Sequence, residues 1–534
     1  MESLARMADG RVDQIYDLAR PFSNFNFLSN HQLFKNIKYS LPRIFCESRR
    51  AKSSTLVVET LDESEETLDE TIALRKVGLI ESKLWRLTFW TCSHDKSIAF
   101  SPADNSLVGY AIVRADILNN RADPVVHVFE SVFQKYDHFH NFVPDSPVFN
   151  ISFGAKRYSL PGVMYCQQNA ITKACAQVSL RSLLATRFPK RSIKYSEIND
   201  AAKVKRNPGK GLNTDQIRSV LDYFKVNYRD VNYDDVSNPA TGSTASYDKL
   251  LYVGIENGGG GLLGFKLSGK NTEGSSFDYG RHIIPFFGHT FNQDTWAPRS
   301  QNSYFHINEE TRYIPSDEWL SSFIGHDDNF GSNYCIPKGF LKSEQVRYAV
   351  ALLPDGYMSY PTEIEAIAAD QLYSLILTVP PQYYKSFWLE KLICYIERQD
   401  VVFRTRAISG EGYIKHLEDM RDWENHRMKD QALLSFLSGF IPKCLWMVEL
   451  SIPEVFSTNY GKLGEILFFG DQELDMGADY TDDQLQQMQV NNIISVRLPG
   501  VMSIRIRNDR MNGKFIPRSC GITGHVPLFG CPAY

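Results

Sequence analysis

The chain has 534 residues, and length alone suggests about three or four domains. Hydrophobic residues make up 43% of it, which is enough to form substantial buried cores. Its 58 basic and 62 acidic side chains give a net charge of −4, so the composition does not favour nucleic acid or an anionic membrane surface as a partner.

Cysteine usage and the N-terminal sequence bear on the compartment. The chain has nine cysteines, an odd and scattered set that does not match the dense even set of a disulfide scaffold. The first residues include Asp9, Asp13 and Asp17 and no long apolar run, so they do not look like a secretory signal. The most apolar later stretch, Leu433–Val448, is interrupted by Pro442 and is too short to span a bilayer. We expect a soluble cytoplasmic protein with no membrane partner.

The chain before residue 155 is predicted to divide into two parts. Residues 1–75 form an N-terminal segment with an acidic linker or exposed helix at Glu59–Thr71. Residues 76–154 form a β-rich domain, because short runs of β-branched and aromatic residues alternate with turn residues. The predicted strands include Trp85–Trp90, Val108–Val113 and Val125–Phe129.

A helix that begins at Cys175 is the central element of the next predicted domain, residues 155–355. Apolar residues recur at helical spacing from Cys175 to Leu184, whereas nothing before Thr172 shares that period. At a helix N-terminus, unpaired backbone N–H groups and the helix dipole favour a thiolate over a thiol. Gln168 lies seven residues upstream, and its amide could donate to an oxyanion formed when Cys175 attacks a carbonyl. The alternative is a core cysteine, since free cysteine is among the most buried residue types.

Helices and strands are predicted to follow this helix. Asn213 or Thr214 is expected to cap a helix, and Leu250–Ile255 and Leu262–Leu267 are expected to be strands. The glycines Gly258–Gly261 lie between these two strands and lack the Gly-Lys-Ser/Thr sequence of a phosphate-binding loop. A flexible hairpin connection is therefore predicted there.

Two later segments supply candidates for a general base and the acid that orients it. His282 opens a strand-like apolar run that closes at Gly288, and Asp328 lies in the polar segment Gly325–Gly331. Cysteine, then histidine on a strand, then a carboxylate on a neighbouring strand is an order that nucleophile, base and orienting acid can take in a thiol hydrolase. The pattern predicts the triad Cys175, His282 and Asp328.

These residues resemble the site of the papain-like cysteine peptidases, including the double-glycine leader peptidases of bacteriocin exporters. Members carry a glutamine shortly before the nucleophile, a helix that starts at that cysteine and a histidine strand of the form His-x-x-x-x-x-Gly. The site ends with Asn-Ser-Trp-Gly, or with an aspartate in the leader-peptidase branch. Gln168, Cys175, His282 with Gly288, and Asp328–Gly331 match these places in order, although the step from Gln168 to Cys175 is one residue longer here.

The resemblance covers roughly residues 155–345, about a third of the chain. It implies an α+β fold in which the nucleophile helix packs on an antiparallel sheet. It also implies that Gln168 and the backbone N–H of Cys175 stabilise the oxyanion. The flanking regions would then be a β-rich N-terminal region and a mixed C-terminal domain.

Other residues remain candidates for the same roles. His289 with Asp294 forms a nearer histidine–acid pair, and Asp327 could replace Asp328 because the strand register is inferred. Cys166 is the other nearby thiol, but no helix follows it, so we expect it in the core or the wall of the site. The cluster His326–Asp328 could hold a cation, although such clusters more often form a turn at a strand end.

Residues 356–534 are predicted to form a mixed helix-and-strand domain without a second catalytic constellation. Thr362–Glu365 reads as a capping box that starts a helix through Leu377. The further predicted elements are helices at Tyr383–Arg398 and Ile414–Arg427 and strands within Lys443–Ile452 and Ile493–Ile506.

The sequence therefore predicts a cysteine peptidase or amidase that hydrolyses a peptide or isopeptide bond through a thioester. We expect a protein or peptide substrate, no cofactor and no metal. A transglutaminase or acyltransferase would use the same triad with an amine as acceptor in place of water. A non-catalytic binding scaffold would instead keep Cys175 in its core.

Overall fold

The fold is described from a computed structural model of the whole chain. The residues that the structure describes are 10–18, 37, 39–94, 100–134, 141–143, 147–172, 174–204, 211–234, 246–270, 276–292, 298–302, 312–377, 387–419, 438–439, 441–472, 492–499, 501–508 and 511–518. Helices combine with largely antiparallel sheets, which is a mixed α+β fold. Within this described part, no helix is both long and apolar enough to cross a membrane.

The chain forms two compact units. The first contains residues 1–234, 259–290 and 322–350, and the second contains residues 235–258, 291–321 and 351–534. The predicted boundary between residues 154 and 155 falls inside the first unit, so the β-rich region and the Cys175 helix share one body.

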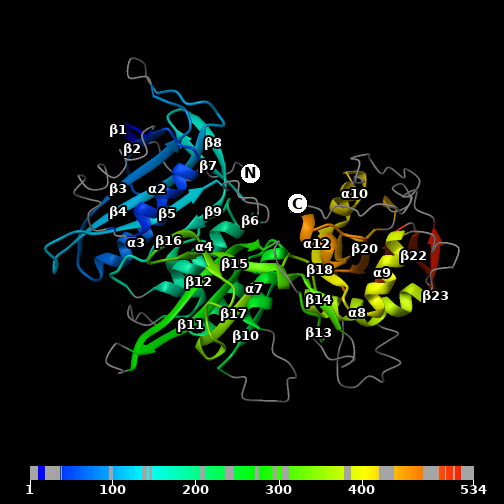
Figure 1. The fold of residues 1–534 in the computed structure, drawn as a ribbon. Helices are drawn as coiled ribbons and strands as arrows, with labels where there is room; N and C mark the ends of the chain where they lie inside the picture. Colours follow the sequence, from blue (N-terminus) through cyan, green and yellow to red (C-terminus); the bar gives the residue numbers. More distant parts are fainter. Residues whose placement is uncertain are drawn as a thin grey trace. The chain divides into compact units, whose positions relative to one another are not determined.

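A six-stranded antiparallel sheet forms one half of the first unit (Figure 1). Its strands in spatial order are β1 (Arg11–Asp17), β2 (Thr55–Leu61), β3 (Leu79–Trp90), β4 (Leu107–Leu118), β5 (Val125–Phe133) and β9 (Val163–Tyr165). The three strands predicted between residues 85 and 129 lie within β3, β4 and β5, which confirms them. Helix α2 (Ser40–Arg50) buries Leu41, Ile44 and Phe45 against this sheet, because these residues share one helix face.

A second sheet forms the other half of the first unit. Its spatial order is β10 (Tyr228–Asn232), β17 (Val346–Leu352), β11 (Gly261–Lys270), β12 (Ser276–Phe291), β15 (Leu320–Asp327) and β16 (Gly331–Pro337), and β6 (Asn141–Phe142) also pairs with β12. The first unit further contains α3 (Glu65–Arg75), α4 (Cys175–Arg187), α5 (Tyr195–Ala201), α6 (Thr214–Tyr223), the short turn η3 (Ser343–Gln345) and the hairpin β7 (Val148–Phe153) with β8 (Lys156–Pro161).

The second unit is built on an eight-stranded sheet. Its order is β13 (Gln301–Asn302), β14 (Arg312–Pro315), β18 (Val402–Ser409), β19 (Cys444–Ser451), β20 (Gly464–Phe469), β21 (Ile493–Leu498), β22 (Val501–Asn508) and β23 (Met511–Arg518). Its described helices are α7 (Tyr247–Glu256), η2 (Ser316–Trp319), α8 (Pro361–Leu377), α9 (Phe387–Glu397), α10 (Gly410–Asp419) and α12 (Pro453–Asn459). The pair β14–β18 is parallel and the other pairs are antiparallel.

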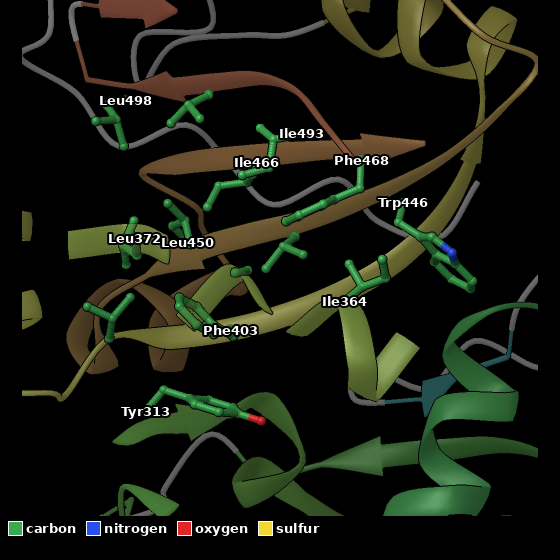
Figure 2. Packing of buried hydrophobic residues seen from close by; sticks show 14 of the residues in the cluster. Tyr313, Ile364, Leu372, Phe403, Trp446, Leu450, Ile466, Phe468, Ile493 and Leu498 are labelled. Atoms are coloured by element: carbon green, nitrogen blue, oxygen red, sulfur yellow. The ribbon is translucent and has the colours of Figure 1, made fainter. Parts of the chain in front are cut away.

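The core of the second unit lies between helices and this sheet. Ile364 and Leu372 of α8 belong to the same buried cluster as Trp446 and Phe468 of the central strands, and Figure 2 shows Leu372 beside Leu450. Trp446 and Phe468 are fully buried. The strands predicted within residues 443–452 and 493–506 supply much of this core and are confirmed.

One predicted strand is a helix. Residues 250–255 lie in α7, which Ser246 caps by accepting a hydrogen bond from the backbone N–H of Lys249 at 3.3 Å. A short, continuously apolar run fits a buried helix as well as a buried strand, and here nearly every residue of the helix is buried. The hairpin predicted at Gly258–Gly261 is wrong for the same reason, because these glycines connect a helix to β11.

The helix caps agree only in part with the predictions. Asn213 caps α6 through a reciprocal pair of hydrogen bonds with Gln216, as predicted. In α8 the cap is shifted by two residues from the predicted box, since Glu363 accepts from the backbone N–H of Tyr360. Glu365 is instead buried and pairs with Lys249 at 2.8 Å. Glu363 is the third residue of the helix that starts at Pro361, which is the position from which a glutamate completes a capping box.

Candidate active site

Cys175 is the first residue of α4, as predicted. The capping position before it is Ala174, whose side chain cannot accept a hydrogen bond from the first turn. The capping position therefore offers no side-chain acceptor to the backbone N–H groups of the first turn. The Ser179 hydroxyl, one turn farther on, donates to the carbonyl of Ile283 at 2.8 Å. This bond ties α4 to the strand residue next to His282.

His282 lies on β12, and its interaction with the thiol of Cys175 is one of the effects that raise the pKa of the imidazole. Its strand neighbour across the ladder is Phe265, and the two rings meet edge to face with centroids 5.6 Å apart. Ile283 points into the core, so strand alternation turns His282 to the other face, where it is half-buried.

Two carboxylates meet the same nitrogen of His282. Asp327 Oδ2 and Asp328 Oδ1 each lie 3.3 Å from His282 Nε2. Asp327 forms a hydrogen bond there and is 17% exposed, whereas Asp328 is 3% exposed. Asp328 Oδ1 also accepts from the side-chain amide of Asn329 at 3.0 Å, and its Oδ2 is buried with no hydrogen-bond partner among the described residues.

The polar cluster at residues 326–328 spans the end of β15 and the first residue of the turn that leads to β16. Asp327 Oδ1 accepts from the backbone N–H groups of Asn329 and Phe330, at 2.8 and 3.1 Å, which is the self-capping geometry of an Asx turn. Asp327 thus uses one oxygen to shape the turn and the other to meet His282. The turn thereby places both aspartates next to the ring of His282.

Helix α2 contacts the turn that carries Asp327 and Asp328, which we call the acid turn. Arg43 Nε donates to the carbonyl of Ser332 at 2.8 Å, and the hydroxyl of Ser332 donates to the buried Glu47 at 2.8 Å. Gly331 has φ +130°, and a Cβ at this position would lie 2.9 Å from Arg43. His326 faces away into the core, where burial lowers its pKa to about 3 and keeps it neutral.

The charges of the site are strongly coupled. Burial alone would lower the pKa of His282, but its hydrogen bonds to Asp327 and Cys175 and the charges of Asp328 and Asp327 outweigh burial and raise that pKa to about 10. Burial would raise the pKa of Asp327, but His282 and the turn N–H groups lower it. Burial raises the pKa of Asp328 to about 6, against the opposing effect of His282. At neutral pH the imidazole is therefore a cation beside the sulfur.

Gln168 lies next to the acid turn. Its backbone N–H donates to the carbonyl of Asp328 at 3.4 Å. Its side-chain Nε2 donates to the carbonyl of Thr172 at 2.8 Å, inside the loop that leads into Cys175. An amide NH2 group carries two hydrogens, so this bond uses one of them.

The rival residues occupy different places. His289 lies on β12, seven residues after His282, so it projects from the opposite face and is fully buried beside β6. Its predicted partner Asp294 lies outside the described residues. Cys166 is buried, and its sulfur accepts a hydrogen bond from Arg181 at 2.9 Å. Burial raises the pKa of this thiol, against the effect of Arg181. Cys166 is thus a buried core residue, and the core was one of the two places predicted for it.

The same groups form the one potential cation site of the described residues. One ligand atom each from His282, Asp327 and Asp328 lies within 4.8 Å of the others. An imidazole nitrogen and carboxylate oxygens fit a divalent transition metal as well as a proton network.

The chain was also compared with known proteins. No protein-family model matches it, and no curated protein is similar to it in sequence.

Proposed function

We propose that the protein is a cysteine peptidase or amidase with a papain-like site, which hydrolyses a peptide or isopeptide bond through a thioester. The observation that carries this proposal is that Asp327 and Asp328 each have a carboxylate oxygen 3.3 Å from His282 Nε2. His282 also interacts with Cys175, the first residue of α4, and this interaction raises the pKa of the imidazole. The tie between α4 and β12 also supports it, since it couples a nucleophile helix to an antiparallel pair that bears the base.

The proposed reaction begins with the thiolate of Cys175 and the imidazolium of His282. The sulfur attacks the substrate carbonyl carbon, the new C–S bond forms, and the carbonyl electron pair moves onto oxygen. The backbone N–H of Cys175 and the amide of Gln168 would donate to this oxyanion. When the tetrahedral intermediate collapses, the C–N bond breaks and the leaving amine takes a proton from His282.

The second half of the reaction restores the enzyme. His282 removes a proton from water, and the resulting hydroxide attacks the thioester carbonyl. The C–S bond breaks, the acid product leaves, and the sulfur again pairs with the protonated imidazole. Because Nε2 faces Asp327 and Asp328, we assign Nδ1 to the proton exchange with sulfur and substrate. The carboxylates hold the ring in this orientation.

Acyl transfer is the second candidate, because an amine that replaces water would intercept the same thioester. Product analysis with and without added methylamine separates the two: an amide product at millimolar amine supports transfer, and the free acid alone supports hydrolysis.

We also propose the cytoplasm as the compartment, since all the cysteines in the described part of the chain are free thiols.

The first test is alkylation of the native protein with iodoacetamide at about pH 6, mapped by mass spectrometry. We expect Cys175 to react at least about tenfold faster than the exposed thiols Cys46, Cys335 and Cys394, because only a thiolate reacts quickly at this pH. The His282→Ala variant should lose this advantage. If the exposed cysteines react first, solvent exposure governs the labelling rate. The proposal of an enzyme would then give way to that of a non-catalytic binding scaffold.

A further inference from the structure

The loop between β9 and α4 is organised around the side chain of Asn169. Its Oδ1 accepts three hydrogen bonds, from the backbone N–H of Ile171 at 3.0 Å, the backbone N–H of Thr172 at 2.9 Å and the hydroxyl of Thr172 at 3.1 Å. Asn169 is only 8% exposed. One buried amide oxygen thus closes the whole turn.

This turn holds a strained backbone beside the proposed oxyanion donor. Ala170 has φ +55°, a left-handed conformation that costs a non-glycine residue about 1 kcal/mol or more. The carbonyl of Thr172 accepts from both the Gln168 side chain, at 2.8 Å, and the backbone N–H of Ala174, at 3.0 Å. The turn closed by Asn169 therefore orients the Gln168 amide and the approach of the chain to Cys175.

The other end of the Asn169 amide is anchored in the six-stranded half of the unit. Its Nδ2 donates to Glu70 Oε1 of α3 at 2.7 Å. Glu70 is buried, and its second oxygen lies 3.6 Å from His127 Nε2 and 3.8 Å from Arg114 Nε. Burial would raise the pKa of Glu70, but His127, Arg114 and Asn169 lower it to about 2, so the carboxylate is charged. A charge-assisted bond of this kind fixes which end of the amide faces the turn.

We propose that Asn169, held by Glu70, is a positioning residue for the reaction: it fixes the 168–172 turn so that the Gln168 amide and the backbone N–H of Cys175 meet the oxyanion. This inference rests on the proposed function. It also means that Glu70 of α3, in the acidic N-terminal segment, acts on the site through Asn169.

The test compares two reactions of Cys175. Iodoacetamide alkylates the thiolate and forms no oxyanion, whereas acylation by p-nitrophenyl acetate passes through one. Asn169→Asp keeps the oxygen that closes the turn but sets a second carboxylate against Glu70. Glu70→Gln alone can still accept from Asn169. In the double variant Asn169→Asp/Glu70→Gln, the new amide of residue 70 can donate to the new carboxylate, which restores the bond with reversed polarity.

The expected result separates the two probes. Asn169→Asp should slow acylation by about 10²-fold, the cost of a misplaced reacting group, while alkylation changes by less than about threefold. Glu70→Gln should slow acylation by less than Asn169→Asp does, because its amide oxygen can still accept from Asn169, and the double variant should recover acylation to within about tenfold of the unaltered protein. If Asn169→Asp fails to fold, Asn169→Ser serves instead, since its hydroxyl can close a turn but cannot reach Glu70.

Three outcomes would overturn the inference. Acylation unchanged in the Asn169 variants would show that the turn does not position the donors. Equal loss of acylation and alkylation, or no recovery in the double variant, would show a general structural role. If the unaltered protein alkylates and acylates no faster at Cys175 than at Cys335, the proposed function itself fails, and this inference fails with it.

Discussion

Replacing Cys175 with serine or alanine is expected to abolish acylation by p-nitrophenyl acetate, with a loss of at least about 10³-fold in the acylation rate constant. The sulfur is the atom that forms the new bond, and a serine hydroxyl beside His282 is a far weaker nucleophile at neutral pH. Release of p-nitrophenol under single-turnover conditions measures the rate. Cys335→Ser is the matched control, because that thiol is exposed and lies on β16 rather than at a helix start.

His282→Ala should reduce acylation to a similar extent, because the thiolate loses its cationic partner. Residues that act as one unit give non-additive losses, so the double variant Cys175→Ser/His282→Ala should be no slower than either single one. His289→Asn tests the rival histidine on the same strand and should stay within about threefold of the unaltered protein if it folds. Full activity of either Cys175 variant, or of His282→Ala, would contradict the proposed chemistry.

The two aspartates are expected to respond in opposite ways to replacement by asparagine. Asp327 has a lowered pKa, so its charge stabilises the folded protein above its ordinary pKa of 3.8, and this stabilisation is lost as the pH falls. Asp328 has a raised pKa of about 6, so the fold favours its protonated form. Above pH 6 the ionised Asp328 carboxylate costs folding free energy, up to about 3 kcal/mol from a rise of 3.8 to about 6.

Asp327→Asn should therefore destabilise the protein at pH 7 and slow acylation by about 10²-fold or more, since it carries the hydrogen bond to His282. Asp328→Asn should stabilise the protein at pH 7 to 8 by about 2 kcal/mol and leave its stability at pH 3 to 4 unchanged, because asparagine resembles the neutral acid. We expect it to slow acylation by only about tenfold. Urea unfolding at the two pH values measures the difference. A loss of stability in Asp328→Asn at pH 7 would refute this account of the pair.

The elements that carry the site were predictable from local patterns. The helix start at Cys175 shows as a change of period at Thr172, and the strand with His282 shows as an apolar run bounded by glycine. Both signals are short-range, so a single chain contains them. The prediction that these two elements meet rested on their order along the chain and on the resemblance to papain-like peptidases.

The features that were missed depend on contacts between distant residues. The sequence favoured Asp328 and left Asp327 as an alternative, whereas the Asx turn of Asp327 brings both carboxylates to His282 Nε2; the register of such a turn cannot be read from composition. Glu70 lies in an acidic run that looks solvated, but it is buried because Arg114, His127 and Asn169 come from other elements. The helix α7 was predicted as a strand because a continuous apolar run has no period to distinguish them.

The strand order of the second sheet has a consequence for synthesis of the protein. Strand β17 lies between β10 and β11, yet it is the last of these strands to leave the ribosome. A nascent chain that has emerged through Gly331 already contains Cys175, His282 and both aspartates, but β11 still has an open edge. We expect such a chain, or a product of premature termination before Val346, to be inert. Strand β11 gains this neighbour only after Val346–Leu352 has been synthesised.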